Sequence, residues 1–229
     1  MRQARGDAPE AKAALSDLCE AYYTPVLRFL QREGKSKDEA EEFTQAFFAR
    51  ILSQNSLQHA DPQKGRFRSY LLGALKNFLG ELRRNQSRQK RGGDVIHESL
   101  DEPESDSSPG LQLPDPESSI PDSYFDREWA LALMDRGLKS VEAKFSKSGK
   151  EQHFEVLKPW LMGDASTLSQ ADAAASLNLT PGAIKVSIHR LRKDFADAIR
   201  NEVAQTVDSP EEISEELRYL IEVFSRPSR

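Results

Sequence analysis

The sequence has 229 residues, with 38% hydrophobic and 30% charged residues and a formal net charge of -5. Its single cysteine, Cys19, excludes an intrachain disulfide and a cluster of cysteine ligands. No run of about 18 apolar residues is present, which excludes an ordinary transmembrane helix. We therefore expect a cytoplasmic protein with small cores and a strongly solvated surface, built from two small domains.

The first elements are predicted to be two helices. Apolar residues recur at helical spacing from Pro9 to Arg32, which indicates an amphipathic helix that Pro25 can bend. Gly34 ends it, and Ser36-Lys-Asp-Glu39 has the capping-box pattern that begins a helix. We expect this second helix to run to about Leu52, before a polar loop that extends to Gly65.

A third helix is predicted from Arg66 to about Gln89, and it carries one apolar stripe and one basic face. Between Lys64 and Gly93 the chain has nine basic residues and one acid, whereas Asp94 to Glu128 has eleven acids and one arginine. Such segregation indicates one surface that attracts phosphate and one segment that repels it. The Asp, Glu, Ser and Pro content of residues 94–122 is typical of a flexible linker.

Helical periodicity resumes after this acidic segment. Helices are predicted from Tyr124 to Phe145 and from Glu151 to Met162. No strand pattern or internal repeat is evident, so the fold class is expected to be all-α.

A helix-turn-helix is predicted from Leu168 to Lys193. The first helix is short and rich in alanine, Asn178 is suited to a turn with positive φ, and Thr180-Pro181 begins the next helix. Ile184, Ile188 and Leu191 are expected to face inward. The outer face would then read DNA with these polar and basic residues: Lys185, Ser187, His189, Arg190, Arg192 and Lys193.

A last amphipathic helix is predicted after Ser209-Pro-Glu-Glu, with an inward face made by Ile213, Leu217, Leu220, Ile221 and Phe224. We expect it to pack on the helix-turn-helix domain. Its acidic outer face leaves two further roles open, masking of the recognition helix or presentation of a surface to a regulator.

Two segments carry a resemblance to a known family. The stretches from Glu41 to Leu52 and from Gly65 to Arg84 resemble region two of the extracytoplasmic-function (ECF) sigma factors, and the helix-turn-helix resembles region four. The resemblance implies region two in residues 1–93, a linker in 94–122, region four in 123–203 and a helical extension in 204–229. It further implies an initiation factor that binds core RNA polymerase through the β′ and β subunits, recognises promoter DNA and melts it.

The resemblance also implies roles for particular residues. Glu42, Gln45, Phe48 and Arg50 match the polymerase-binding helix, although Phe48 is equally compatible with a core position. The DNA-facing residues of the third helix would be Arg66, Arg68, Lys76, Asn77, Arg83 and Arg84, preceded by a base-capturing loop from Asn55 to Lys64. Tyr70 departs from the family pattern, in which tryptophan is frequent at that position.

Two other classes of function are alternatives. A helix-turn-helix regulator that binds duplex DNA without polymerase is the main alternative. An enzyme is the weakest, because the four histidines are scattered and no nucleophile motif is present, so no cofactor and no metal are expected. An anti-sigma factor or another regulator remains open as a further partner.

Overall fold

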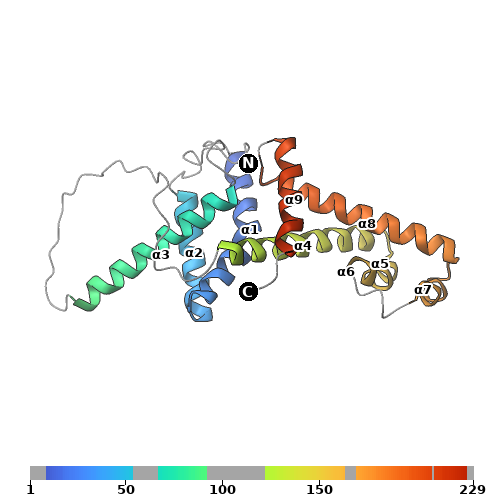
Figure 1. Cartoon of the computed structure of the whole chain (residues 1–229), viewed down its shortest axis with the longest axis horizontal. Helices are drawn as coiled ribbons and strands as arrows, with labels where there is room; N and C mark the ends of the chain where they lie inside the picture. The colour runs from blue at the N-terminus through green and yellow to red at the C-terminus, as the bar shows by residue number, and fades with distance from the viewer. Residues whose placement is uncertain (1–8, 54–66, 92–121, 163–168, 208, 226–229) are drawn as a thin grey trace. The chain divides into compact units, whose positions relative to one another are not determined.

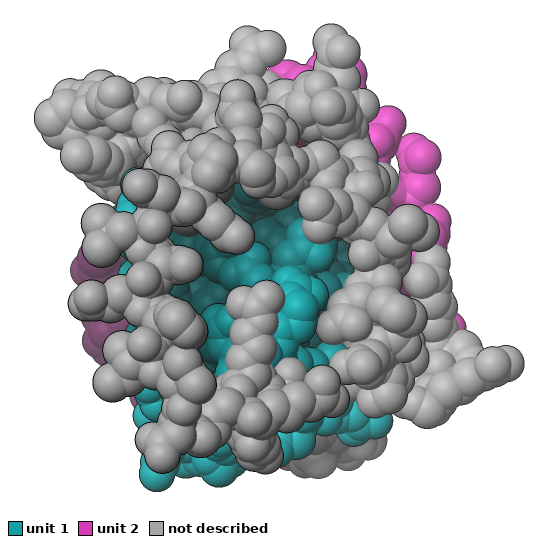
Figure 2. Space-filling model, turned by 90° about the vertical axis from the view of Figure 1, so that its left-hand side faces the viewer, with its two compact units in different colours: residues 1–129 teal, residues 130–229 magenta. Residues whose placement is uncertain are grey.

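The computed structural model describes residues 9–53, 67–91, 122–162, 169–207 and 209–225. Over these ranges the regular elements are nine helices without a strand, which confirms the expected all-α class (Figure 1). The chain divides into two compact units, residues 1–129 and 130–229, which are coloured separately in Figure 2. The boundary between them falls inside a helix. The expected linker lies almost wholly outside the described residues, so the four-part division stays a prediction.

Unit 1 contains three helices and the start of a fourth. These are α1 (Pro9–Arg32), α2 (Lys37–Ser53), α3 (Phe67–Arg91) and the first two turns of α4 (Asp122–Lys147). Their buried faces are rich in aromatic side chains: the ring of Tyr22 lies 5.3 Å from that of Phe67, and Phe47 lies 5.7 Å from Phe78. Aromatic rings bury large apolar areas, so these residues supply much of the core of this small unit.

The connection from α1 to α2 follows the predicted capping box. Gly34 adopts φ 84°, a left-handed conformation that favours glycine, and this ends α1. The Ser36 amide donates to the Glu39 carboxylate at 2.9 Å, and the Glu39 amide donates back to the Ser36 hydroxyl oxygen at 3.3 Å. These bonds to Ser36 lower the pKa of Glu39 below its ordinary value. The helix α1 itself continues through Pro25.

Unit 2 consists of the rest of α4 and five further helices. They are α5 (Glu151–Leu157), α6 (Pro159–Met162), α7 (Gln170–Leu177), α8 (Pro181–Ala204) and α9 (Pro210–Ser225). The single helix expected from Glu151 to Met162 was wrong, since it is broken at Lys158. Pro159 lacks an amide hydrogen and its ring would clash with the carbonyl one turn earlier, which explains the break.

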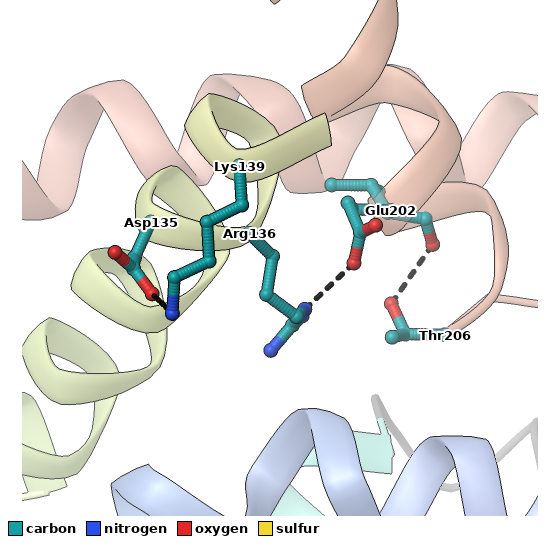
Figure 3. A network of polar contacts seen from close by, with 6 residues as sticks. Asp135, Arg136, Lys139, Glu202 and Thr206 are labelled. Atoms are coloured by element: carbon teal, nitrogen blue, oxygen red, sulfur yellow. Dashed lines mark hydrogen bonds and ion pairs between the residues drawn. The ribbon is translucent and has the colours of Figure 1, made fainter. Parts of the chain in front are cut away.

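The helices α4 and α8 pack antiparallel in unit 2. Arg136 Nε donates to Glu202 at 2.7 Å, whereas Lys144, two turns further along α4, pairs with Asp194 at 2.6 Å. Figure 3 shows Arg136 directed at Glu202, beside the exposed Asp135–Lys139 pair of α4 and near Thr206. Gly137 lies between these contacts, and a Cβ atom there would come within 2.5 Å of the Ile199 side chain. The glycine therefore lets the two helices approach closely.

The last helix, α9, packs against α8, which confirms that part of the prediction. Its inward face was predicted only in part. Leu220 is buried as expected, but Val223 and Glu216 are buried too, whereas Ile221 and Phe224 are 68% and 39% exposed. The apolar arc of α9 is wider than its contact with α8, so periodicity alone could not select the covered side.

Candidate nucleic-acid interface

The turn between α7 and α8 is held by local hydrogen bonds. The Asp172 amide donates to the Ser169 hydroxyl oxygen at 3.1 Å and caps α7. Asn178 ends α7 at φ 57° and ψ 39°, and the Leu179 amide donates to the Ala174 carbonyl at 2.9 Å. Asparagine tolerates this left-handed conformation better than most residues. The predicted turn chemistry is thereby confirmed.

The start of α8 is equally well defined. The Ala183 amide donates to the Thr180 hydroxyl oxygen at 3.2 Å, and Pro181 takes the first helical position, where its missing amide hydrogen costs nothing. Small side chains on α7 allow the two helices to approach, since Ala173 is fully buried and Ala174 is 5% exposed. This arrangement fixes the direction in which α8 presents its outer face.

The inner and outer faces of α8 divide as predicted. Ile184, Ile188 and Leu191 are buried in the core of unit 2. The predicted DNA-facing residues lie on the opposite side: Lys185, His189, Arg190, Arg192 and Lys193 are exposed, and Ser187 is half-buried. The outer face therefore offers cations and hydrogen-bonding groups in a helix of the size that a major groove admits.

Val186 is a residue of this face that the sequence prediction omitted. It is 49% exposed, although valine is usually buried, and it lies beside Lys185 and one turn before Arg190. The sequence does indicate this position, because helical spacing with Ile184, Ile188 and Leu191 facing inward places residue 186 on the outer face. An exposed apolar side chain on such a face suits the 5-methyl group of thymine.

Arg192 has a second role in the scaffold. Its Nε and one terminal nitrogen donate to the Trp160 carbonyl oxygen at 3.4 and 3.2 Å, which ties α8 to α6. A guanidinium has five N–H donors, so these two bonds leave donors for phosphate.

The candidate polymerase-binding residues of α2 occupy two different environments. Glu42 and Gln45 are exposed on the outward face. Phe48 is only 6% exposed and stacks on Tyr23 with ring centroids 6.2 Å apart. Of these residues, Glu42 and Gln45 therefore lie on the outward surface of α2, whereas Phe48 supports the packing beneath it.

Arg50, the fourth of these residues, is committed to an ion pair. Its guanidinium donates twice to the Glu81 carboxylate of α3, once at 3.2 Å, and this hydrogen bonding raises the pKa of Arg50. Both side chains are 41% exposed, so the pair links α2 to α3 at the surface.

The basic face of α3 is much less open than its sequence indicates. Arg84 is exposed and Asn77 is half-buried, but Arg68 and Lys76 are only 4% and 8% exposed. Arg83 bonds at 2.6 Å to Glu33, the residue that follows α1, whose carboxylate side chain is 4% exposed. The structure brings these residues to one helix, yet three of the cations already contact acids.

Arg68 and Lys76 are covered by the start of α4. Arg68 Nε donates to Asp126 at 2.6 Å, and its guanidinium lies 4.5 Å from the centroid of the Trp129 ring. Lys76 pairs with Asp122 in the first turn of the same helix. Arg66 and the loop from Asn55 to Lys64 lie outside the described residues.

The described part of the chain contains no group of three or more potential ligands that could hold a metal ion. Burial raises the pKa of the Cys19 thiol to about 12, which keeps it protonated and a poor nucleophile at neutral pH. Among the described helices, none combines the length and apolar character that spanning a membrane requires.

Comparison with known proteins gives one match. A family model described as ECF sigma factor matches residues 3–201, which is most of the chain and includes both α2–α3 and the helix-turn-helix. Neither the curated proteins nor the solved structures include a match to this sequence.

Proposed function

The chain belongs to the ECF sigma factor family, whose members are promoter-specific initiation factors of RNA polymerase, and from this premise we propose a division of labour between its parts. The outward face of α2 binds core polymerase. The basic face of α3, with the loop before it, binds the melted strand of the downstream promoter element. The outer face of α8 reads the upstream element in duplex DNA.

The exposed outer face of α8 is the observation that carries this proposal. Lys185, His189 and Arg190 lie opposite the buried Ile184 and Ile188, on a helix whose first turn is capped by Thr180. Side chains near the amino end of such a helix reach base edges, and basic residues further along contact phosphates. Duplex recognition by α8 alone would also suit a simple regulator, so polymerase binding is the part that needs a test.

The outward face of α2 supports the polymerase contact. Glu42 and Gln45 project from a helix whose other side is anchored by Phe47 and Ile51, which are 1% and 4% exposed. Substitutions at Glu42 and Gln45 should therefore change the surface and leave the core of unit 1 unaltered.

Transcription in vitro with purified core polymerase on genomic fragments tests the proposal. The wild-type chain should bind core enzyme and direct initiation from discrete sites. The variant E42A/Q45A should lose core binding while its circular dichroism spectrum and melting temperature are retained, and E20Q, an exposed change on α1, should behave as wild type. Absence of any association between the wild-type chain and core polymerase would refute the proposal, even if unit 2 binds duplex DNA.

A further inference from the structure

The first two turns of α4 cover part of the basic face of α3. Residues 122–129, which we call the latch segment, contain three acids and three aromatic residues and belong to the same compact unit as α1 and α3. Phe125 is fully buried, with its ring centroid 6.0 Å from that of Phe29 in α1. Arg32 of α1 lies over the ring of Tyr124, 5.0 Å from its centroid. The latch segment is thus docked by apolar and cation–π contacts.

Two of the three acids of the latch segment form ion pairs with the basic face of α3. Asp126 bonds to Arg68, and the two side chains are 15% and 5% exposed. Asp122, one helical turn earlier, pairs with Lys76, whose side chain is 9% exposed. Carboxylates and phosphates satisfy guanidinium and ammonium groups through the same charge-assisted hydrogen bonds. While the latch segment is docked, these two cations cannot reach a nucleic-acid backbone.

Several features indicate that phosphate groups can replace the carboxylates of the docked latch segment. The indole Nε1 of Trp129 is buried without a hydrogen-bond partner in the described part of the chain, which weakens the contact. A buried ion pair contributes little net stability, because desolvation of both charges offsets their attraction. Asp122 is 65% exposed, so water and ions reach the Lys76 pair from one side.

We propose that the latch segment is an internal competitor of single-stranded DNA for Arg68 and Lys76. Docked, it holds the single-strand surface of α3 closed; displaced, it exposes both cations for backbone phosphates. This inference rests on the proposed function, since it takes α3 to be the single-strand surface. It adds that the chain itself regulates access to that surface.

The competition can be tested with full-length variants in which acids are neutralised. Their affinity for a fluorescein-labelled single-stranded oligonucleotide of mixed sequence is measured by fluorescence anisotropy. D122N/D126N removes both carboxylates that face α3 and should raise affinity by roughly tenfold, because apparent affinity scales with the fraction of open molecules. Adding R68Q/K76Q should abolish this gain.

A matched control separates the latch from net charge. D135N/E142Q neutralises two exposed acids of α4 outside the latch segment and makes the same change in total charge. It should leave affinity within about twofold of wild type, because exposed charges distant from the site are screened. Equal gains in the two double variants, or no gain in D122N/D126N, would overturn the proposal.

A second measurement needs no substitution in the latch segment. In a W160F background Trp129 is the only tryptophan, and it is 1% exposed when docked. Saturation with the oligonucleotide should increase quenching of Trp129 by acrylamide, and unchanged quenching with bound DNA would refute displacement. If only the latch proposal is wrong, the wild type should still direct polymerase-dependent transcription. If the proposed function is wrong, neither the wild type nor any variant should direct it.

Discussion

Replacement of Gly137 by alanine tests the close approach of α4 and α8. A Cβ atom at this position would lie 2.5 Å from Ile199 Cδ1, 3.2 Å from Ile199 Cγ1 and 3.4 Å from Phe195 Cε2. Carbon atoms pack best at about 3.5–4.0 Å, so the first contact is too short by about 1 Å. Ile199 is 5% exposed and has little room to move.

Two opposing terms set the size of the effect. Alanine is favoured over glycine inside a helix by about 0.5–1 kcal/mol, whereas an extra methyl group forced into a packed interface costs about 1–3 kcal/mol. We therefore expect Gly137→Ala to lower the free energy of unfolding of unit 2 by about 1 kcal/mol. Ile199→Val alone should lower it by about 1 kcal/mol, because it removes a buried methyl group.

The double variant distinguishes a clash from a general loss of packing. G137A/I199V removes the Cδ1 atom that the new methyl group would meet, so its stability should return close to that of the parent. The coupling between the two sites should be about 2 kcal/mol. Guanidinium unfolding followed by Trp160 emission in a W129F background reports on unit 2. Additive losses, with coupling below about 0.3 kcal/mol, would refute the close approach of the two helices.

Three further predictions concern local features. Replacing one thymine of the upstream element by uracil should weaken DNA binding by the wild type roughly fourfold, which corresponds to the burial of one methyl group. The same replacement should leave DNA binding by the Val186→Ala variant unchanged. Equal losses of affinity in both proteins would contradict a contact between Val186 and thymine. Thr180→Ala should lower the stability of unit 2 by about 1 kcal/mol in thermal melts through loss of the α8 cap, and an unchanged melting temperature would contradict this. Because the pKa of Glu39 is lowered in the folded state, its ionised carboxylate stabilises the fold at pH values above the ordinary pKa of 4.5. This contribution to stability is lost as the pH falls below 4.5 and through the pKa of the folded state. Denaturation between pH 3 and 6 should therefore be less pH-dependent in Glu39→Gln, whereas an unaltered pH profile would exclude the carboxylate from the cap.

Local signals in the sequence predicted the features that local physics controls. The capping box of Ser36, the left-handed Asn178 and the cap of Thr180 depend on residues within about four positions of one another, and all three lie where the sequence indicated. Pro159 carried an equally local signal against a continuous helix, and the prediction ignored it. The division of α8 into an inner and an outer face followed from helical periodicity alone.

The environment of the basic residues depends on contacts that no local pattern contains. Asp122 and Asp126 lie 46 and 58 residues after the cations that they pair with. A basic helical face is ordinarily solvated, so no local pattern predicts that Arg68 is only 4% exposed. Helical periodicity predicts the helix from Tyr124 onward but places it in the second domain, whereas residues 122–129 belong to unit 1. Pairing between distant segments was thus the missing information.

The basic residues of α8 are exposed, whereas two basic residues of α3 are buried in ion pairs. This difference predicts the order in which the two helices contact DNA. The cations of α8 are exposed because its apolar side is buried and its first turn is capped, so contact with duplex DNA requires no rearrangement within the helix-turn-helix. Arg68 and Lys76 of α3 face carboxylates, so contact with a single strand must first break two ion pairs. Under the proposed function, binding should therefore begin on closed duplex and continue on the opened strand. Neutralising Asp122 and Asp126 should accelerate the single-strand step and leave duplex binding by α8 unchanged.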